Sequence, residues 1–312
     1  MRVSLRTSVW LAGVVLLGAG VRAPAAELEK YFPSDTKAVL TVNVKQMLAS
    51  PLVKDSLDML RQEMQNSAEA QQTLTALGFD PLKDLDSVAV AVASFEDRER
   101  LLFVFSGRFN PTKFKATAEQ TAKNMPELLK IHAAGDRQVY EVSIPNHPAL
   151  FVAVVDGTTL VASHHQARVT QIFDIKAGKT GSALNKDLKA LLAKADAKQT
   201  ISLAVLGGAL GDQVPHGDQV ENINGGITLT DGIRTNVAIQ AKNAEAAKML
   251  ADLVQMGLEQ GKNLVEFAAM TNRQLAPLAG LVNSLKVSDQ GNTVTVKGEV
   301  DKAALDKLKK GQ

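Results

Sequence analysis

The chain has 312 residues, with 35 Lys or Arg against 33 Asp or Glu, and it contains no cysteine. The nearly balanced charge gives no electrostatic basis for binding a nucleic acid. Without cysteine there is no disulfide framework, so a hydrophobic core has to stabilise the fold. Only one Trp and two Tyr are present, which disfavours the aromatic platforms of sugar-binding and quaternary-ammonium sites.

The first 25 residues are predicted to be a signal peptide. Arg2 and Arg6 give a basic start, the uncharged stretch Ser8–Val21 follows, and the small-x-small pattern "APA" ends at Ala25. The apolar stretch is shorter than the about 20 residues of a spanning helix, so we expect cleavage near Ala25 and no stable transmembrane anchor afterwards. An uncleaved N-terminal anchor is the alternative. The protein is therefore predicted to be exported, to the periplasm or the extracellular space.

Removing this leader changes the composition. Three arginines and no acidic residue are lost, so 35 − 3 = 32 basic residues remain against 33 acidic ones and the net charge becomes −1. The only tryptophan, Trp10, is also lost. The remaining 312 − 25 = 287 residues are enough for one large domain or for two of ordinary size.

The first half of the remaining chain alternates between strand and helix patterns. A strand is predicted over Ala38–Val44, followed by a helical region over Lys45–Leu77 that Gly78 ends. The next expected elements are a hairpin of strands Ser87–Ser94 and Leu101–Phe109, a helix capped by Asn110, strands over Leu128–His132 and Gln138–Ser143, a hairpin turning at Asp156-Gly157 and a helix over Gln166–Lys176.

A polar stretch with two glycines, Ala177–Ala183, is predicted to link this half to the next one. It divides the chain into lobes of residues 26–178 and 179–312. In the second lobe we expect a helix over Asn185–Ala195, a strand over 199–206, a hairpin turning at Asp231-Gly232, a helical region from Asn243 to Leu285, a hairpin turning near Gln290-Gly291 and a helix over Lys302–Lys309.

The two lobes are spaced like copies of one duplicated unit. The expected helix caps Asn110 and Asn243 lie 243 − 110 = 133 positions apart, and Asp156 and Asp289 in the later hairpins lie 289 − 156 = 133 apart. The sequence therefore predicts an α+β fold of two repeated lobes, each a mainly antiparallel sheet backed by helices in the order strand, hairpin–helix, hairpin–helix. An α+β protein without duplication is the alternative, and one sheet shared by both lobes is compatible with the pattern.

The segments "YFPSDTKAVLTVNVKQMLASPLV" and "LGFDPLKDLDSVAVAVAS" resemble the mature N-terminal regions of an uncharacterised family of exported bacterial proteins of planctomycete type. The resemblance covers roughly residues 31–110, and its motifs are turns and strand starts rather than catalytic signatures. It implies export and an α+β fold. It implies no activity, cofactor or site residue.

Neither glycine-rich stretch fits a nucleotide-binding motif. Gly207, Gly208 and Gly211 follow a strand, but "QVPHGDQ" comes next where a helix would have to face the pyrophosphate. The stretch "AGKTGS" lacks the first glycine of a phosphate-binding loop, because Phe173 occupies that position. The sequence has no cysteine nucleophile and no Gly-x-Ser-x-Gly motif. It therefore predicts no catalytic residue and no cofactor.

One loop of the second lobe carries nitrogen and oxygen ligands close together in sequence. Asp212, His216, Asp218 and Glu221 are candidate ligands for a divalent metal ion. Polar residues are common in loops, and the calcium-loop pattern is absent. A metal-dependent enzyme thus stays open as a third hypothesis.

The helical region from Ala244 to Leu285 carries small residues and Met at steps of three and four, among them Ala247, Leu250 and Met256. This pattern is typical of a helix packed on a sheet, and it also suits an apolar groove or a partner helix. The leading hypothesis is a non-enzymatic binding or structural module of the cell envelope, with an unidentified envelope or extracellular macromolecule as its partner. The alternative is a carrier that holds a hydrophobic ligand between the sheet and the Met- and Ala-rich helices.

Overall fold

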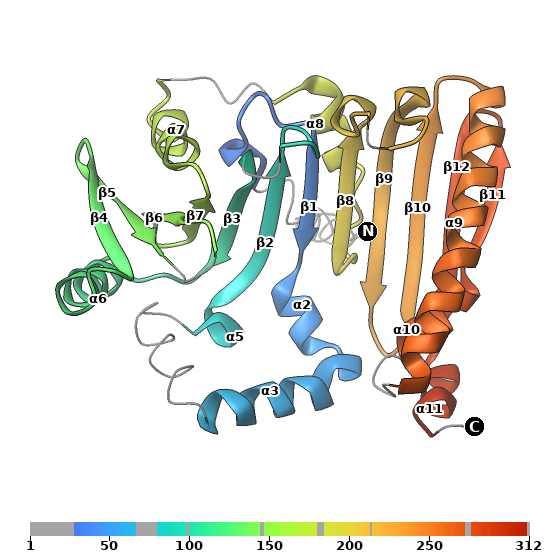
Figure 1. Cartoon of the computed structure of the whole chain (residues 1–312), viewed down its shortest axis with the longest axis horizontal. Coiled ribbons are helices and arrows are strands. Elements are labelled where there is room, and N and C mark those ends of the chain that lie inside the picture. Colours follow the sequence, from blue (N-terminus) through green and yellow to red (C-terminus); the bar gives the residue numbers. More distant parts are fainter. Residues whose placement is uncertain are drawn as a thin grey trace, which may run out of the picture.

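The structure, a computed structural model, describes residues 28–66, 80–97, 100–143, 147–179, 184–212, 214–271 and 276–310. The predicted signal peptide, residues 67–79 of the first predicted helical region and its expected end, and part of the predicted linker lie outside these ranges. The described chain forms one large antiparallel sheet with helices on both faces (Figure 1), so the α+β prediction is confirmed.

The sheet has twelve strands in the order β11-β12-β10-β9-β8-β1-β2-β3-β7-β6-β5-β4, and the paired neighbours run antiparallel. The strands are β1 (Ala38–Val42), β2 (Leu85–Val92), β3 (Leu102–Gly107), β4 (Leu129–Ala134), β5 (Arg137–Val142), β6 (Leu150–Asp156), β7 (Thr159–Ser163), β8 (Ile201–Leu206), β9 (Val220–Leu229), β10 (Ile233–Ala241), β11 (Lys286–Gln290) and β12 (Thr293–Val300). Each predicted hairpin is present.

Four helices begin at an asparagine that caps them. Asn43, Asn110, Asn185 and Asn243 each accept a backbone N–H of the first turn that follows, which satisfies a donor that has no partner inside the helix. The helices are α2 (Val44–Ala49), α3 (Lys54–Asn66), α5 (Pro81–Asp84), α6 (Pro111–Asn124), α7 (Gln166–Lys176), α8 (Lys186–Ala193), α9 (Ala244–Thr271), α10 (Ala276–Ser284) and α11 (Lys302–Lys310), with short 3-10 turns η1 (Glu29–Tyr31), η2 (Pro51–Val53), η4 (Gly207–Ala209) and η5 (Gly217–Gln219).

The two halves of the chain meet in the middle of the sheet, where β1 pairs with β8 over five residues, from Ala38 opposite Val205 to Val42 opposite Ile201. Outward from this seam the first half runs β1-β2-β3-β7-β6-β5-β4 and the second runs β8-β9-β10-β12-β11. The two strand orders differ by the β4–β5 hairpin at the outer edge of the first half. Two repeated lobes stay a prediction.

Helices cover the two faces of the sheet unequally. Because side chains alternate along a strand, Val39 and Ala204 enter a core with η1, α7 and α8, while Val205 and Ile223 face the opposite way and pack with α9. On the α9 face, α6 covers the outer strands of the first half, and α10 and α11 cover one end of the second. Each face thus has its own hydrophobic core.

The strands of the second half are polar on the face away from α9. The helices that pack on β10 and β12, namely α9, α10 and α11, lie on the apolar face of these strands. The other face carries an almost unbroken polar set, consisting of Asn222, Asn224, Thr228, Arg234, Asn236, Gln240, Thr293, Thr295, Lys297 and Glu299. This arrangement is usual for an antiparallel sheet with one solvated side.

Candidate functional site

Eight apolar side chains form two adjacent rows across the four middle strands, on the face that bears α6 and α9. We call them the central apolar face. Paired positions across β3, β2, β1 and β8 give the rows Phe103–Val90–Leu40–Leu203 and Phe105–Val88–Val42–Ile201. None of the eight is fully buried, and Leu40 is 38% exposed although β1 lies in the middle of the sheet.

The sequences of the middle strands explain this face. β1 reads AVLTV and β2 reads LDSVAVAV, so apolar residues stand at neighbouring positions and point to both faces of the sheet. The alternate residues Val39, Ala89 and Val104 are fully buried beneath η1, α7 and α8. The residues that alternate with them along the strands, such as Leu40, Val88 and Val90, are also apolar. They point to the opposite face, where their burial is incomplete.

Helices border the central apolar face on two sides. Phe105 packs against the cluster that contains α6, and Val90 and Leu203 pack against the cluster that contains α9. In Figure 1, α6 lies beyond one side of the middle strands and α9 beyond the other, with α2 and α3 at the lower end. The central apolar face therefore lies between α6 and α9.

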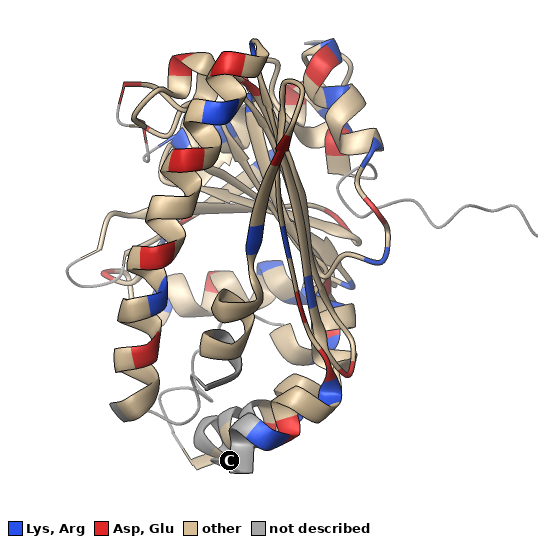
Figure 2. Ribbon diagram, turned by 90° about the vertical axis from the view of Figure 1, so that its right-hand side faces the viewer, with Lys and Arg blue, Asp and Glu red and all other residues tan. Residues whose placement is uncertain are grey.

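The last two thirds of α9 extend away from the sheet. Residues such as Ala247 and Leu250 are buried against it, but no residue from 252 to 270 is buried. Leu264 and Phe267 are 72% and 71% exposed. Nineteen residues of helix are about 28 Å long, and Figure 2 shows this part of α9 standing off the strands. Sheet packing therefore explains only the first turns of the predicted Met- and Ala-rich stripe.

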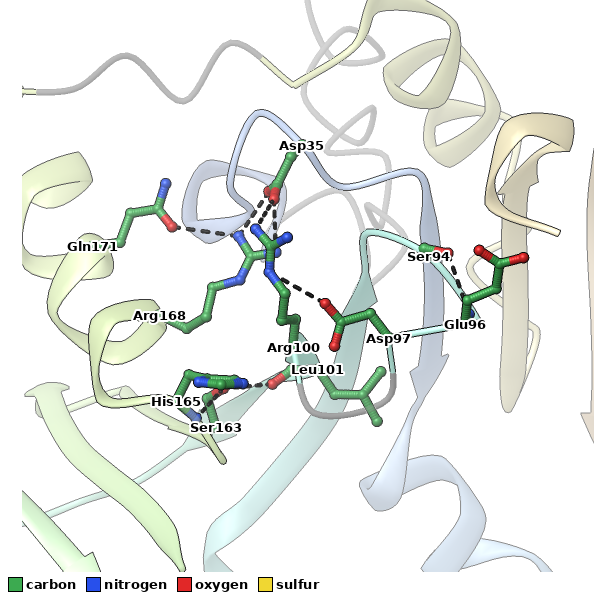
Figure 3. A network of polar contacts seen from close by, with 10 residues as sticks. All are labelled: Asp35, Ser94, Glu96, Asp97, Arg100, Leu101, Ser163, His165, Arg168 and Gln171. Carbon is green, nitrogen blue, oxygen red and sulfur yellow. Dashed lines mark hydrogen bonds and ion pairs between the residues drawn. The ribbon is translucent and has the colours of Figure 1, made fainter. Parts of the chain in front are cut away.

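A polar network holds the loop before β1 at one end of the middle strands (Figure 3). Arg168 of α7 donates from Nη1 and Nη2 to Asp35 Oδ1 and Oδ2 at 2.7 and 2.8 Å. Arg100 donates to the same Oδ2 at 3.1 Å, and its Nε lies 3.7 Å from Asp97 Oδ2. Burial raises the pKa of Asp35, but the hydrogen bonds and charge of Arg168, together with Arg100, outweigh burial and hold this pKa below its usual value.

The other polar groups of this network have structural partners. The Ser163 hydroxyl donates to the Leu101 carbonyl at 2.7 Å and accepts the His165 backbone N–H at 3.2 Å. Glu96 accepts the Asp212 backbone N–H at 3.0 Å, which ties the β2–β3 turn to the loop after β8. A serine nucleophile would instead need its hydroxyl hydrogen-bonded to a basic side chain. The network therefore connects loops at this end of the sheet to one another and to α7.

The predicted metal ligands take up different local roles. Asp212 donates its backbone N–H to Glu96, and His216, whose φ is 57°, directly precedes η5. Asp218 accepts a hydrogen bond from the Gln219 side chain, and Glu221 is exposed on β9. Within the described ranges, no three His, Asp or Glu side chains are grouped as metal ligands. The metal site stays a sequence-based hypothesis.

Two features of this region were not apparent from the amino-acid sequence. The apolar residues of β1 and β2 were visible as strands, but the pattern did not tell which of their two faces the helices would cover. The Asp35–Arg168 pair joins residues 133 positions apart, and no local pattern connects them. The only available signal was an arginine next to the apolar residues that α7 buries, Val169, Ile172 and Phe173, because a buried arginine requires a partner.

Comparison with known proteins identifies no family. No family model and no curated protein matches the chain. The chain is similar to solved structures of TP0453. Crystal form III has a TM-score of 0.48 at 8% identity over 91% of this chain and 98% of that one. Form IV has 0.44 at 8% over 90% and 95%, and form I has 0.41 at 10% over the same shares. At these values the likeness carries no functional argument.

Proposed function

We propose that the protein is an exported, non-enzymatic binding module that holds a hydrocarbon chain, such as the acyl chain of a lipid, against the central apolar face. The observation that carries the proposal is the incomplete burial of two apolar rows in the middle of the sheet. Burying apolar surface contributes about 25 cal/mol per Å². An apolar ligand would cover the apolar surface that the described helices leave partly exposed.

The size of the central apolar face favours a chain-like ligand over a protein partner. Neighbouring strands lie about 4.8 Å apart, so four strands span roughly 14 Å, and the face is only two side chains high. A stable protein interface covers about 800 Å² on each partner, which is several times larger. The proposal thus favours the carrier hypothesis over a macromolecular partner, and it agrees with the small and Met residues along α9.

Export remains part of the proposal. Its support is the basic, then apolar, then small-residue pattern of residues 1–25 and the resemblance of residues 31–110 to exported bacterial proteins. In the part of the chain that the structure describes, no helix is both long and apolar enough to span a bilayer. Intact mass of the protein purified from its own host would test it, since we expect a mature chain that begins at Ala26.

The ligand proposal is tested by substitution of Leu40, the most exposed residue of the central apolar face. Leu40→Asp places a carboxylate among apolar side chains, so we expect affinity for a fluorescent long-chain fatty acid to fall at least about tenfold, because desolvating an unpaired charge is costly. Ser288→Asp, on the exposed edge strand β11, adds the same charge elsewhere and should bind like wild type. Circular dichroism would verify that both variants fold.

Native mass spectrometry of the protein from its own host gives a second readout. An added mass in the lipid range that Leu40→Asp loses would support the proposal. Equal fatty-acid affinity in wild type and Leu40→Asp would rule out the central apolar face as the binding site. Hydrolytic turnover that one carboxylate or His substitution abolishes would show instead that the protein is an enzyme.

A further inference from the structure

The polar face of the second half of the sheet, opposite α9, contains a cavity of about 260 Å³. Three pairs of directly opposed positions on β9 and β10 form its floor, and the C-terminal end of α8 with its connection to β8 forms its rim. The floor pairs are Asn224–Ala238, Gly226–Asn236 and Thr228–Arg234. This cavity lies on the other side of the sheet from the central apolar face, so what it binds is independent of the proposed function.

The charged side chains that line the cavity are mainly cationic. Lys194, Lys198 and Arg234 line it, against one carboxylate from Asp196. Among the described residues neither lysine has an ion-pair partner, whereas Arg234 is paired with Glu299 at 2.7 Å. A cleft lined by one sign of charge concentrates ligands of the opposite sign. The excess of positive charge therefore favours an anion.

Gln199 adds a polar group that the protein itself does not satisfy. Its side chain lies across the floor, since a Cβ on Gly226 would come within 2.9 Å of Gln199 Cδ. Its Oε1 is buried and has no hydrogen-bond partner in the described structure. Leaving such a group unpaired is costly, and a ligand hydroxyl that donates to it would remove the cost.

The remaining lining is suited to a small hydrophilic ligand. Asn224, Asn236 and Thr228 offer amide and hydroxyl groups at the floor. The volume of about 260 Å³ is just below the 300–1,000 Å³ range typical of ligand pockets. None of the described residues that line the cavity is aromatic, so a stacked base or sugar ring is not favoured.

From these observations we infer that the cavity between α8, β9 and β10 binds a small anion that carries a hydroxyl group. The phosphate or carboxylate would lie between Lys194 and Lys198, and the hydroxyl would donate to Gln199 Oε1. Glycerol 3-phosphate and glycerate are suitable probes, because both carry hydroxyl groups and they differ in the anionic group. Inorganic phosphate offers the charge without a carbon-bound hydroxyl.

Isothermal titration calorimetry of these three probes at about 0.1 M salt tests the inference. We expect saturable binding of glycerol 3-phosphate or glycerate, and the tighter of the two identifies the anionic group. Lys194→Gln with Lys198→Gln should weaken the tighter probe about tenfold or more, since charge-assisted hydrogen bonds are lost. Gln199→Leu, which keeps side-chain volume but removes the amide, should weaken the same probe about fivefold.

The matched control removes two charges far from the cavity. Lys113→Gln with Lys123→Gln, on α6 over the outer strands of the first half, should leave binding unchanged at about 0.1 M salt, where charges more than about 10 Å apart are screened. Absence of saturable binding by either hydroxylated probe would overturn the inference. So would equal weakening by both lysine pairs, or inorganic phosphate bound as tightly as the better probe. Urea titrations would show that each variant is folded.

Discussion

Arg168 and Arg234 each donate to a carboxylate at 2.7 Å, but their surroundings differ. The Arg168 side chain is 8% exposed and makes two parallel hydrogen bonds to Asp35, whereas those of Arg234 and Glu299 are 65% and 57% exposed. Water screens the second pair, and exposed ion pairs contribute little to stability. We therefore expect burial, rather than the N–O distance, to determine how much each ion pair contributes to the free energy of unfolding.

The first prediction compares these two arginines. Arg168→Met leaves Asp35 half-buried with Arg100 as its remaining cation, so we expect unfolding to become about 2 kcal/mol easier. This is below the 3–5 kcal/mol typical of fully buried pairs, because the Asp35 side chain is 40% exposed. Arg234→Met should be indistinguishable from wild type. Urea unfolding measures both, and equal losses would contradict the importance of burial.

Like Asp35, Asp156 is a carboxylate of the first half that accepts several hydrogen bonds. Lys176 donates to its Oδ2, and Thr158 donates to Oδ1 from the backbone at 2.9 Å and from the hydroxyl at 2.8 Å. Burial raises the pKa of Asp156, but the hydrogen bonds from Lys176 and Thr158 outweigh it and hold this pKa well below its usual value. Folding thus favours the ionised form.

This depressed pKa predicts the pH dependence of stability. Stability from Asp156 is fully present above the pKa of an unfolded Asp, about 3.9, and is lost as the pH falls towards the folded value. We expect the free energy of unfolding to decrease from about pH 5 downward, less steeply in Asp156→Asn. Urea titrations across this range measure the slope. Equal slopes in wild type and Asp156→Asn would refute the assignment.

At the scale of elements, equal spacing in the sequence corresponds to different structures. Between Asn110 and Asp156 the chain forms α6 and the β4–β5 hairpin before β6, whereas the equally long span from Asn243 to Asp289 contains α9 and α10 before β11. The cap at the start of the span and the strand at its end are common to both. In the second half, further helix takes the place of the hairpin, so α9 is long and extends beyond its contacts with the sheet.

The asparagine caps of α6 and α9 are expected to contribute to stability. Asn110 accepts the Lys113 N–H at 3.0 Å, and Asn243 accepts the Ala246 N–H at 2.8 Å. Substituting either Asn by Ala leaves a first-turn N–H without this acceptor and should cost about 1 kcal/mol of stability. Asn→Asp at the same positions keeps the acceptor and adds a charge that the helix dipole favours, so thermal unfolding should stay near wild type. An equal loss with Asp and Ala would mean that capping is not the cause.

At the scale of the whole molecule, the two halves share their hydrophobic cores as well as their sheet. The largest core combines Val39 and Val104 of the first half with Leu188 and Ala204 of the second. The core under α9 likewise includes Ala38 and Val92 from the first half. Separating the halves would expose both cores and leave β1 and β8 as unpaired edge strands.

We therefore expect one cooperative unfolding transition. Calorimetric and van't Hoff enthalpies should agree, and Leu188→Ala, at a fully buried position, should shift the whole transition by about 2–5 kcal/mol. Leu264→Ala, at an exposed position on α9, should change stability little. Two transitions, of which Leu188→Ala moves only one, would show that the halves are independent domains.

Much of the fold could be predicted because its determinants are local. Asn110 and Asn243 cap helices through backbone groups three residues away, and the turn at Asp156-Gly157 joins strands that are neighbours in sequence. The predicted helix Gln166–Lys176 has the bounds that the structure shows. Periodicity, caps and turns are short-range, so one sequence contains them.

The candidate sites depend on contacts between distant parts of the chain. Short-range patterns were enough to predict an α+β protein of hairpins and capped helices with nearly neutral charge. They could not predict that β1 pairs with β8, that Arg168 binds Asp35, or that helices leave the side of Leu40 incompletely covered. The physical reason is that an apolar strand residue can face either side of a sheet, and packing of distant helices decides which side is buried.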